Sequence, residues 1–291
     1  MRLTPEDRLQ PILDALPAGS HVTLAPGIYR QKAVIRTPGL TITGEGPEET
    51  VIVWGDYARK PHPVGWEYNT FRTYTLAVCA DNVTIRGISV VNDAGSPTQK
   101  GQEVALSVVA TGFSMENCVL SSTQDTLFLG PLPSDLIGRY EGFLPDELRR
   151  GGPMTQQFRN CLVEGTVDFI FGRGSALFEN CEIRSLGGKQ TVGYVTAPAQ
   201  EAHQTEGFRF QACRFTCEER VATGSVFLGR PWRDHGMAVF EDCEYGRHIA
   251  PAGFDPWSGT RRDLTARFSE TPPVAGRVDW INRREKSSVS W

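Results

Sequence analysis

Two aspartates stand in short apolar runs with the character of buried strands. Asp168 lies in GTVDFIFG, residues 165–172, and Asp125 lies in QDTLF, residues 124–128. Burying a carboxylate among apolar side chains costs free energy unless the group is paired or hydrogen-bonded. Each aspartate is therefore expected to have a polar partner and a chemical role.

The spacing of the two aspartates predicts that they lie side by side. Asp125 comes seven residues after Cys118, and Asp168 comes seven residues after Cys161. Both cysteines belong to a repeated pattern, so an equal offset means an equal position on successive repeats. If neighbouring repeats pair as parallel strands, about 4.8 Å apart, the two carboxylates stack on one face.

Two carboxylates this close cannot both remain ionised, so we expect the pKa of one to rise while the pKa of the other stays low. Arg230, in LGRPW, is the candidate cation that decides which one stays ionised. The pair would then act as one nucleophilic carboxylate and one protonated general acid.

Acyl transfer also needs hydrogen-bond donors for a developing oxyanion, and two glutamines are placed to supply them. Gln124 directly precedes Asp125, and Gln102 comes 22 residues before Gln124, about one repeat. Trp232, close to Arg230, offers an apolar plane for a sugar ring. We also expect the aromatic residues Phe128 and Phe169 to contact the substrate.

Composition excludes several other functions. The 291 residues carry 30 Lys and Arg against 34 Asp and Glu, a net charge of −4 without long runs of one sign, which argues against nucleic-acid binding. The motifs GxSxG, HExxH and the phosphate-binding P-loop are absent. The five histidines are scattered and no CxxC pair occurs, so we expect neither a metal ion nor an organic cofactor.

No apolar run has the length of a signal peptide or a transmembrane helix. As written, the sequence predicts a cytoplasmic protein without a membrane partner, or a secreted one if a leader precedes it. We expect a monomer.

The elements that must position these residues are mostly short strands. Residues 5–16 predict one amphipathic helix, with Thr4 as its N-cap and Pro17 at its end. After it, period-two apolar patterns recur between Gly and Pro. They occupy residues 21–29, 32–37, 40–46, 50–55 and 76–92.

A repeat then becomes visible in which an aromatic residue is followed by polar residues and a cysteine. The cysteines of this repeat are Cys118, Cys161, Cys181, Cys213 and Cys243. The 20-residue interval between the second and third matches one coil of a parallel β-helix, and the longer intervals match a coil with an inserted loop. The alternative is a two-sheet β-sandwich, which rarely repeats at this period.

Stacked coils place equivalent residues in interior rows, so the repeat cysteines are expected to be buried free thiols. That expectation agrees with a reducing compartment. We predict one domain, 1–291, with an N-terminal cap over 1–20, a tail over 282–291 and an inserted loop over 130–152 that rims the site.

At these residues the chain resembles the pectin methylesterase (pectinesterase) family. The motifs QDTLF, GTVDFIFG and LGRPW resemble its three main blocks, and GQEVALSV (101–108) resembles a fourth. LAPGIYRQKAVI (24–35) resembles its N-terminal segment, with Gln31 in the usual Glu position. The resemblance covers residues 8–281 and implies a right-handed parallel β-helix that hydrolyses methyl esters of galacturonate units in pectin.

The resemblance also implies a role for each site residue, without a metal or cofactor. Asp168 resembles the nucleophile and Asp125 the acid and then the base. Gln102 and Gln124 resemble the oxyanion donors. Arg230 resembles the residue that orients Asp168, and Trp232 resembles a cleft aromatic.

Three features depart from the family pattern. Thr123 stands where an aromatic residue often precedes QDT, the 130–152 loop is long, and no leader is seen. The last feature suggests a substrate shortened to oligogalacturonides. Two other functions stay open. One is a glycoside hydrolase, but the transition state of glycoside hydrolysis has no oxyanion for the glutamine pair to bind. The other is an inactive sugar-binding solenoid.

Overall fold

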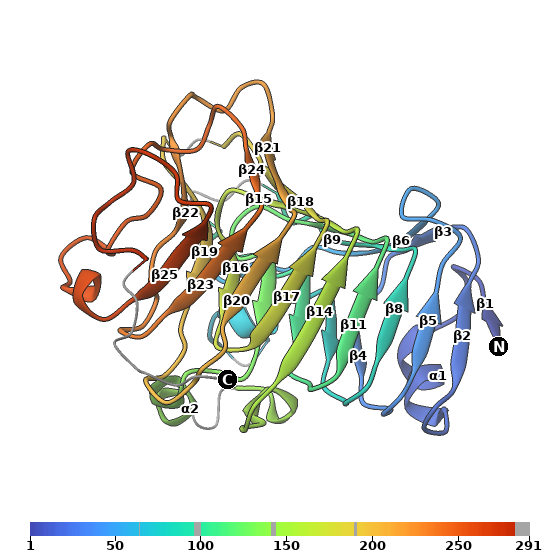
Figure 1. Ribbon diagram of the computed structural model, residues 1–291. Coiled ribbons are helices and arrows are strands. Elements are labelled where there is room, and N and C mark those ends of the chain that lie inside the picture. The colour runs from blue at the N-terminus through green and yellow to red at the C-terminus, as the bar shows by residue number, and fades with distance from the viewer. Residues whose placement is uncertain (64, 96–99, 141–143, 189–190, 283–291) are drawn as a thin grey trace, which may run out of the picture.

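The computed structural model describes residues 1–63, 65–95, 100–140, 144–188 and 191–282 and has the form of a three-sided stack of coils (Figure 1). Every pairing between its named strands is parallel. The fold is the predicted parallel β-helix. A β-sandwich, which is built from antiparallel sheets, is excluded.

Each coil contributes one strand to each of three sheets, and the sheets are best followed one at a time. The ten-stranded sheet has the order β1 (Arg2–Leu3), β2 (His21–Leu24), β5 (Thr41–Thr43), β8 (Thr84–Arg86), β11 (Phe113–Glu116), β14 (Thr155–Arg159), β17 (Ser175–Glu179), β20 (Phe208–Gln211), β23 (Met237–Glu241), β25 (Arg267–Thr271).

The eight-stranded sheet has the order β24 (Glu244–Tyr245), β21 (Arg214–Cys217), β18 (Glu182–Ser185), β15 (Leu162–Gly165), β12 (Val119–Ser121), β9 (Ser89–Asn92), β6 (Thr50–Trp54), β3 (Gly27–Tyr29). The seven-stranded sheet, which carries the site, has the order β22 (Val226–Gly229), β19 (Gly193–Pro198), β16 (Val167–Gly172), β13 (Leu127–Leu129), β10 (Leu106–Val108), β7 (Leu76–Val78), β4 (Ala33–Ile35). The strand runs predicted from the sequence are confirmed.

A left-handed residue turns the chain from the ten-stranded to the eight-stranded sheet just before each repeat cysteine. The residue at this bend is Asn117, Asn160, Asn180, Ala212 or Asp242, with φ between 51° and 52°. Asn and Asp tolerate this conformation better than other residues with a side chain. The bend explains the polar residue that precedes most of the repeat cysteines.

The interior rows stack like residues on like. Phe158, Phe178, Phe210 and Phe240 form a ladder with ring centroids 4.7, 4.6 and 5.0 Å apart. The repeat cysteines form a second ladder, and all seven cysteines of the chain are free thiols. Cys118, Cys161, Cys181 and Cys213 are buried as predicted, whereas Cys243, near the end of the stack, is partly exposed.

The N-terminal helix α1 (Leu9–Ala15) packs beside β4 in the first coils (Figure 1). It is shorter than predicted, and Thr4 is not its N-cap. The backbone N–H and Oγ1 of Thr4 donate to the Asp7 carboxylate, which closes a separate turn. The Gln31 side chain instead accepts a hydrogen bond from the Leu9 N–H, 2.9 Å long, and so caps the helix.

The segment over 130–152, which is expected to be a loop, contains more secondary structure than its weak strand pattern suggests. It contains α2 (Ser134–Arg139) and the 3₁₀ helix η2 (Asp146–Arg149), and it is called the inserted segment below. A further 3₁₀ helix, η1 (Thr70–Arg72), lies before β7, and η3 (Arg262–Leu264) lies before β25. Of the predicted tail, 283–291 lies outside the described residues.

Helices are too short or too polar in the described part of the chain for any of them to cross a membrane.

Candidate active site

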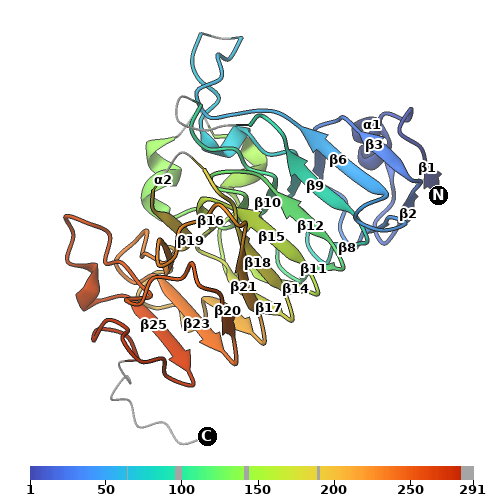
Figure 2. The same ribbon diagram turned by 90° about the horizontal axis from the view of Figure 1, so that it is seen from above.

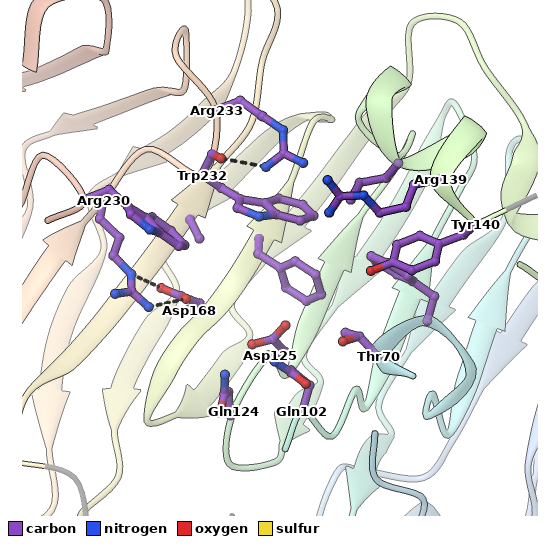
Figure 3. A pocket seen from close by; sticks show the side chains of 15 residues that line it. Thr70, Gln102, Gln124, Asp125, Arg139, Tyr140, Asp168, Arg230, Trp232 and Arg233 are labelled. Carbon is purple, nitrogen blue, oxygen red and sulfur yellow. Dashed lines mark hydrogen bonds and ion pairs between the residues drawn. The ribbon is translucent and has the colours of Figure 1, made fainter. Parts of the chain in front are cut away.

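A cavity of about 440 Å³ opens on the outer face of the seven-stranded sheet (Figure 3). It brings together six residues that the sequence analysis names as candidates. The first and the last of them are more than 100 residues apart in the chain. They are Gln102, Gln124, Asp125, Asp168, Arg230 and Trp232.

Asp125 and Asp168 occupy equivalent positions on neighbouring coils. The residues just before them, Gln124 and Val167, form a parallel bridge, and the Asp125 N–H donates to the Val167 carbonyl at 3.1 Å. Farther along, Leu127 of β13 pairs with residue 170 of β16 in the same register. The stacking predicted from the cysteine spacing is therefore present.

A bulge at Asp168 directs its carboxylate out of the sheet. Val167 pairs with Tyr194 and Ile170 pairs with Thr196, so β16 has one more residue here than β19. Asp168 has φ of 48°, and Asp125 likewise has φ of 64°. Such strain is common where a side chain is re-aimed at a functional site.

Arg230 holds the Asp168 carboxylate through two hydrogen bonds. Nε donates to Oδ1 at 2.9 Å and Nη2 donates to Oδ2 at 2.6 Å. The guanidinium lies between the rings of Tyr194 and Trp257, with its central carbon 3.8 and 4.1 Å from the ring centroids. The two ring contacts hold the Arg230 guanidinium in place, and its two hydrogen bonds then fix the orientation of the Asp168 carboxylate.

The electrostatics separate the two acids, although the pKa values of both are raised. Burial first, and then the charge of Asp168, raise the pKa of Asp125 well above its usual range. Burial also raises the pKa of Asp168, and Arg230 opposes that rise. The expectation that one pKa stays low is wrong because both carboxylates lose their water. Asp168 still ionises first, since it alone has a bidentate cation.

The two glutamines lie on the floor of the pocket beside Asp125 (Figure 3). The Glu103 N–H donates to the Gln124 carbonyl at 3.0 Å, in the same pattern by which the Asp125 N–H bonds to Val167, so Gln102 faces Gln124 on the neighbouring coil. The two glutamines therefore stack on neighbouring coils, as their 22-residue spacing predicted. Side-chain amides of this kind can donate to an oxyanion.

Thr123, which stands in place of an aromatic residue, pairs with the acid next to Gln102. Its Oγ1 donates to Oε2 of Glu103 at 2.7 Å. Glu103 is fully buried, and burial raises the pKa of its carboxyl. This contact joins the backbone segments that carry the two glutamines.

Two predicted substrate contacts are wrong. Phe169 is fully buried in the interior of the coils, because the bulge at Asp168 turns it inward beside Ile170. Gly165 leaves room for it, since a Cβ there would lie 2.4 Å from the Cβ of Phe169. Phe128 is fully buried under the pocket, between Phe71 and Phe171.

The pocket also has residues that no sequence motif indicated. Phe171 packs edge-on against Trp232, with centroids 5.9 Å apart, and takes the place expected of Phe169. A bulge has no clear sequence signal. The other lining residues lie outside the named strands, except Ala197, which pairs with Phe171 across the sheet. They are Thr70, Phe71, Leu136, Arg139, Tyr140, Ala197, Arg233 and Trp257.

No three His, Cys, Asp or Glu side chains come together to hold a metal ion among the residues that the structure describes. The chemistry available at the pocket is that of two carboxylates, one guanidinium and two amides. This set suits attack by Asp168 on an acyl carbon, with a neighbouring acid to protonate the leaving group.

Comparison with known proteins finds one family over most of the chain. The model of the family described as Pectinesterase matches residues 15–131 and 152–288. Pectinesterase 31 of Arabidopsis thaliana is 29% identical over 275 residues, covering 90% of this chain and 77% of its own length. Pectinesterase QRT1 of the same plant is 28% identical, covering 92% and 66%. A further Arabidopsis thaliana relative is 30% identical over 252 residues, and this chain spans only 60% of its length.

Solved structures share the fold. A pectin methylesterase from carrot has a TM-score of 0.79 and 23% identity, covering 96% of this chain and 85% of its own. A pectin methylesterase solved in complex with a hexasaccharide has a TM-score of 0.74 and 23% identity, covering 94% and 88%. The β-helix and the position of its sheets are thus common to this chain and those proteins.

Proposed function

Because the chain belongs to the pectinesterase family, we propose that it hydrolyses the methyl esters of galacturonate units in pectin or in oligogalacturonides, releasing methanol. One observation carries the proposal most directly. Asp125 and Asp168 are in register on neighbouring coils, and Arg230 holds only the second of them. The site therefore has one oriented, ionised carboxylate beside one protonated carboxyl.

In the first half of the reaction, an Asp168 oxygen attacks the C6 carbonyl carbon of a methylated galacturonate. The carbonyl oxygen becomes an oxyanion and accepts hydrogen bonds from the amides of Gln102 and Gln124. The intermediate collapses, the bond between C6 and the methoxy oxygen breaks, and Asp125 gives its proton to the departing methanol.

In the second half, Asp125 is an ionised carboxylate and accepts a proton from water. The hydroxide attacks C6 of the acyl-enzyme, and the bond to Asp168 breaks to release the free galacturonate. Asp125 is protonated again and Asp168 is again a carboxylate paired with Arg230. All of these groups come from one chain, which supports action as a monomer.

Methanol and new reducing ends, measured in the same samples, test the proposal. With methylated pectin and methylated oligogalacturonides, we expect methanol without new reducing ends, and a fall of at least about a thousandfold for Asp168→Asn. Asp14→Asn, an exposed aspartate of α1 that does not line the pocket, is the control. Reducing ends without methanol would assign the carboxylates to glycosidic cleavage, and neither product would leave a sugar-binding role.

A further inference from the structure

The inserted segment is a part of the pocket wall that the family model does not match. The family model matches up to residue 131 and resumes at 152, so it leaves out nearly all of this segment. Yet Leu136, Arg139 and Tyr140 from its helix α2 line the cavity that holds the two aspartates. Figure 2 places α2 beside the seven-stranded sheet.

Apolar packing fixes this wall on the sheet. Leu132, Leu136 and Leu148 are buried in one cluster with Phe71 and Phe128, on the outer side of the seven-stranded sheet. Burying a leucine contributes about 2 kcal/mol relative to leaving it exposed. The helix is therefore held against the sheet even though it has only two turns.

Ion pairs add direction to that packing. Arg233 donates to both carboxylate oxygens of Asp135, at 3.0 and 2.8 Å, and thereby ties α2 to the strand end that carries Trp232. Arg150, at the far end of the segment, donates to both oxygens of Asp81, at 2.9 and 2.8 Å. The segment is therefore anchored at α2 itself and again at its C-terminal end.

Arg139 is the cation that this wall presents to the pocket. Figure 3 shows its side chain extending from α2 toward Trp232. Arg230 and Arg233, which line the same cavity, are each paired with an aspartate, whereas no described carboxylate pairs with the exposed Arg139. Arg139 keeps its donors available for a ligand.

Arg139 and Tyr140 also line a second cavity, of about 710 Å³, that adjoins the first. The second cavity contains one more cation, Arg59, and one anion, Glu67. Arg139 consequently lies at the boundary between the cavity of the reacting ester and the space where a neighbouring sugar of the same chain would lie.

We propose that Arg139 binds the free carboxylate of a galacturonate unit next to the unit whose ester is cleaved. The proposal rests on the proposed function and deepens it. A guanidinium group recognises a carboxylate through charge-assisted hydrogen bonds, which a methyl ester cannot match. Each turnover creates such a carboxylate, so the inserted segment makes the enzyme prefer substrate that is already partly de-esterified.

Two tetragalacturonates test this preference: one fully methyl-esterified, and one with a single methyl ester. We expect the wild type to have the higher kcat/KM on the second, through a lower KM, and to lose that preference at high salt. Arg139→Gln should reduce the preference about tenfold, and Arg139→Lys should restore part of it. Arg149→Gln, an arginine of the same segment outside both cavities, should behave as wild type.

Calorimetry with tetragalacturonate free of esters separates this proposal from the esterase activity. Arg139→Gln should weaken binding about tenfold, whether or not methanol is released. Equal loss on both esterified substrates, with unchanged binding of the free acid, would overturn the carboxylate site and leave the esterase standing. Binding through Arg139 without any methanol release would overturn the esterase instead.

Discussion

Asp125 and Asp168 are related by one step of the β-helix: the N–H of Asp125 donates to the carbonyl of the residue before Asp168, at 3.1 Å. The backbone ladder therefore sets the distance between the two acids, independently of their side chains. Only one of the pair has a bidentate cation. Burial and then the nearby charge of Asp168 raise the pKa of Asp125, and Arg230 orients Asp168, which is the division of labour that acyl transfer needs.

The pH profile of kcat/KM should be bell-shaped. Activity rises with pH as Asp168 ionises and falls as Asp125 loses its proton. Because burial raises both pKa values, the acid limb should lie above the usual range for an aspartate, and the alkaline limb higher still. Methanol release across pH measures both limbs. In Asp125→Asn the residual activity should lack the alkaline limb, and an unchanged limb there would contradict the assignment.

Asp125→Asn should make the protein more stable at neutral pH while it lowers activity. A carboxyl whose pKa is raised by folding stabilises the fold below its unfolded pKa, and that contribution is lost as pH rises through the folded pKa. Asn at this position cannot ionise, so the fold no longer loses that stability as the pH rises. Thermal unfolding should therefore show a Tm higher by a few degrees at pH 7, with a smaller difference in acid. Asp146→Asn, at an exposed site, should leave Tm unchanged at both pH values.

Arg230→Lys should lower kcat about a hundredfold. Lysine cannot form the bidentate pair with Asp168, nor can its ammonium fill the slot between Tyr194 and Trp257 as a planar guanidinium does. Initial rates of methanol release measure the loss. Arg209→Lys, which changes an arginine paired with Glu241 on the ten-stranded sheet, is the matched control. Equal kcat in the two variants would mean that Asp168 does not depend on this pair for its orientation.

Phe169→Ala and Phe171→Ala should have opposite signatures. Phe169 is fully buried in the interior, so its truncation should cost about 3–5 kcal/mol of the free energy of unfolding. Phe171 lines the pocket against Trp232, so its truncation should raise KM with a smaller effect on stability. Urea unfolding and methanol kinetics on both variants distinguish the roles. A larger rise in KM for Phe169→Ala than for Phe171→Ala would mean that Phe169 contacts the substrate.

The sequence predicted the fold and the acid pair for the same physical reason. A parallel β-helix stacks like residues, so a cysteine repeat reports the register directly, and equal offsets from Cys118 and Cys161 placed the two aspartates together. The predictions from the sequence failed at positions where the register between neighbouring coils breaks. The bulge at Asp168 reversed the side of Phe169.

The inserted segment could not be interpreted by the same means, because it has no counterpart on the other coils. Its contribution depends on contacts between distant parts of the chain, such as Arg233 with Asp135. The sequence predicts the start of α1 too early for a related reason. Its cap, Gln31, comes from a later coil rather than from the adjacent sequence.

The inserted segment leaves the stack after β13 and returns before β14, so it interrupts the chain between the two acids without separating them in space. Any excursion that leaves and returns at the same points keeps the reactive pair intact. Selection can therefore lengthen, shorten or replace this excursion and change which polymer is accepted, while the hydrolytic step is inherited unaltered. The same independence makes it a natural position for grafting loops in protein engineering.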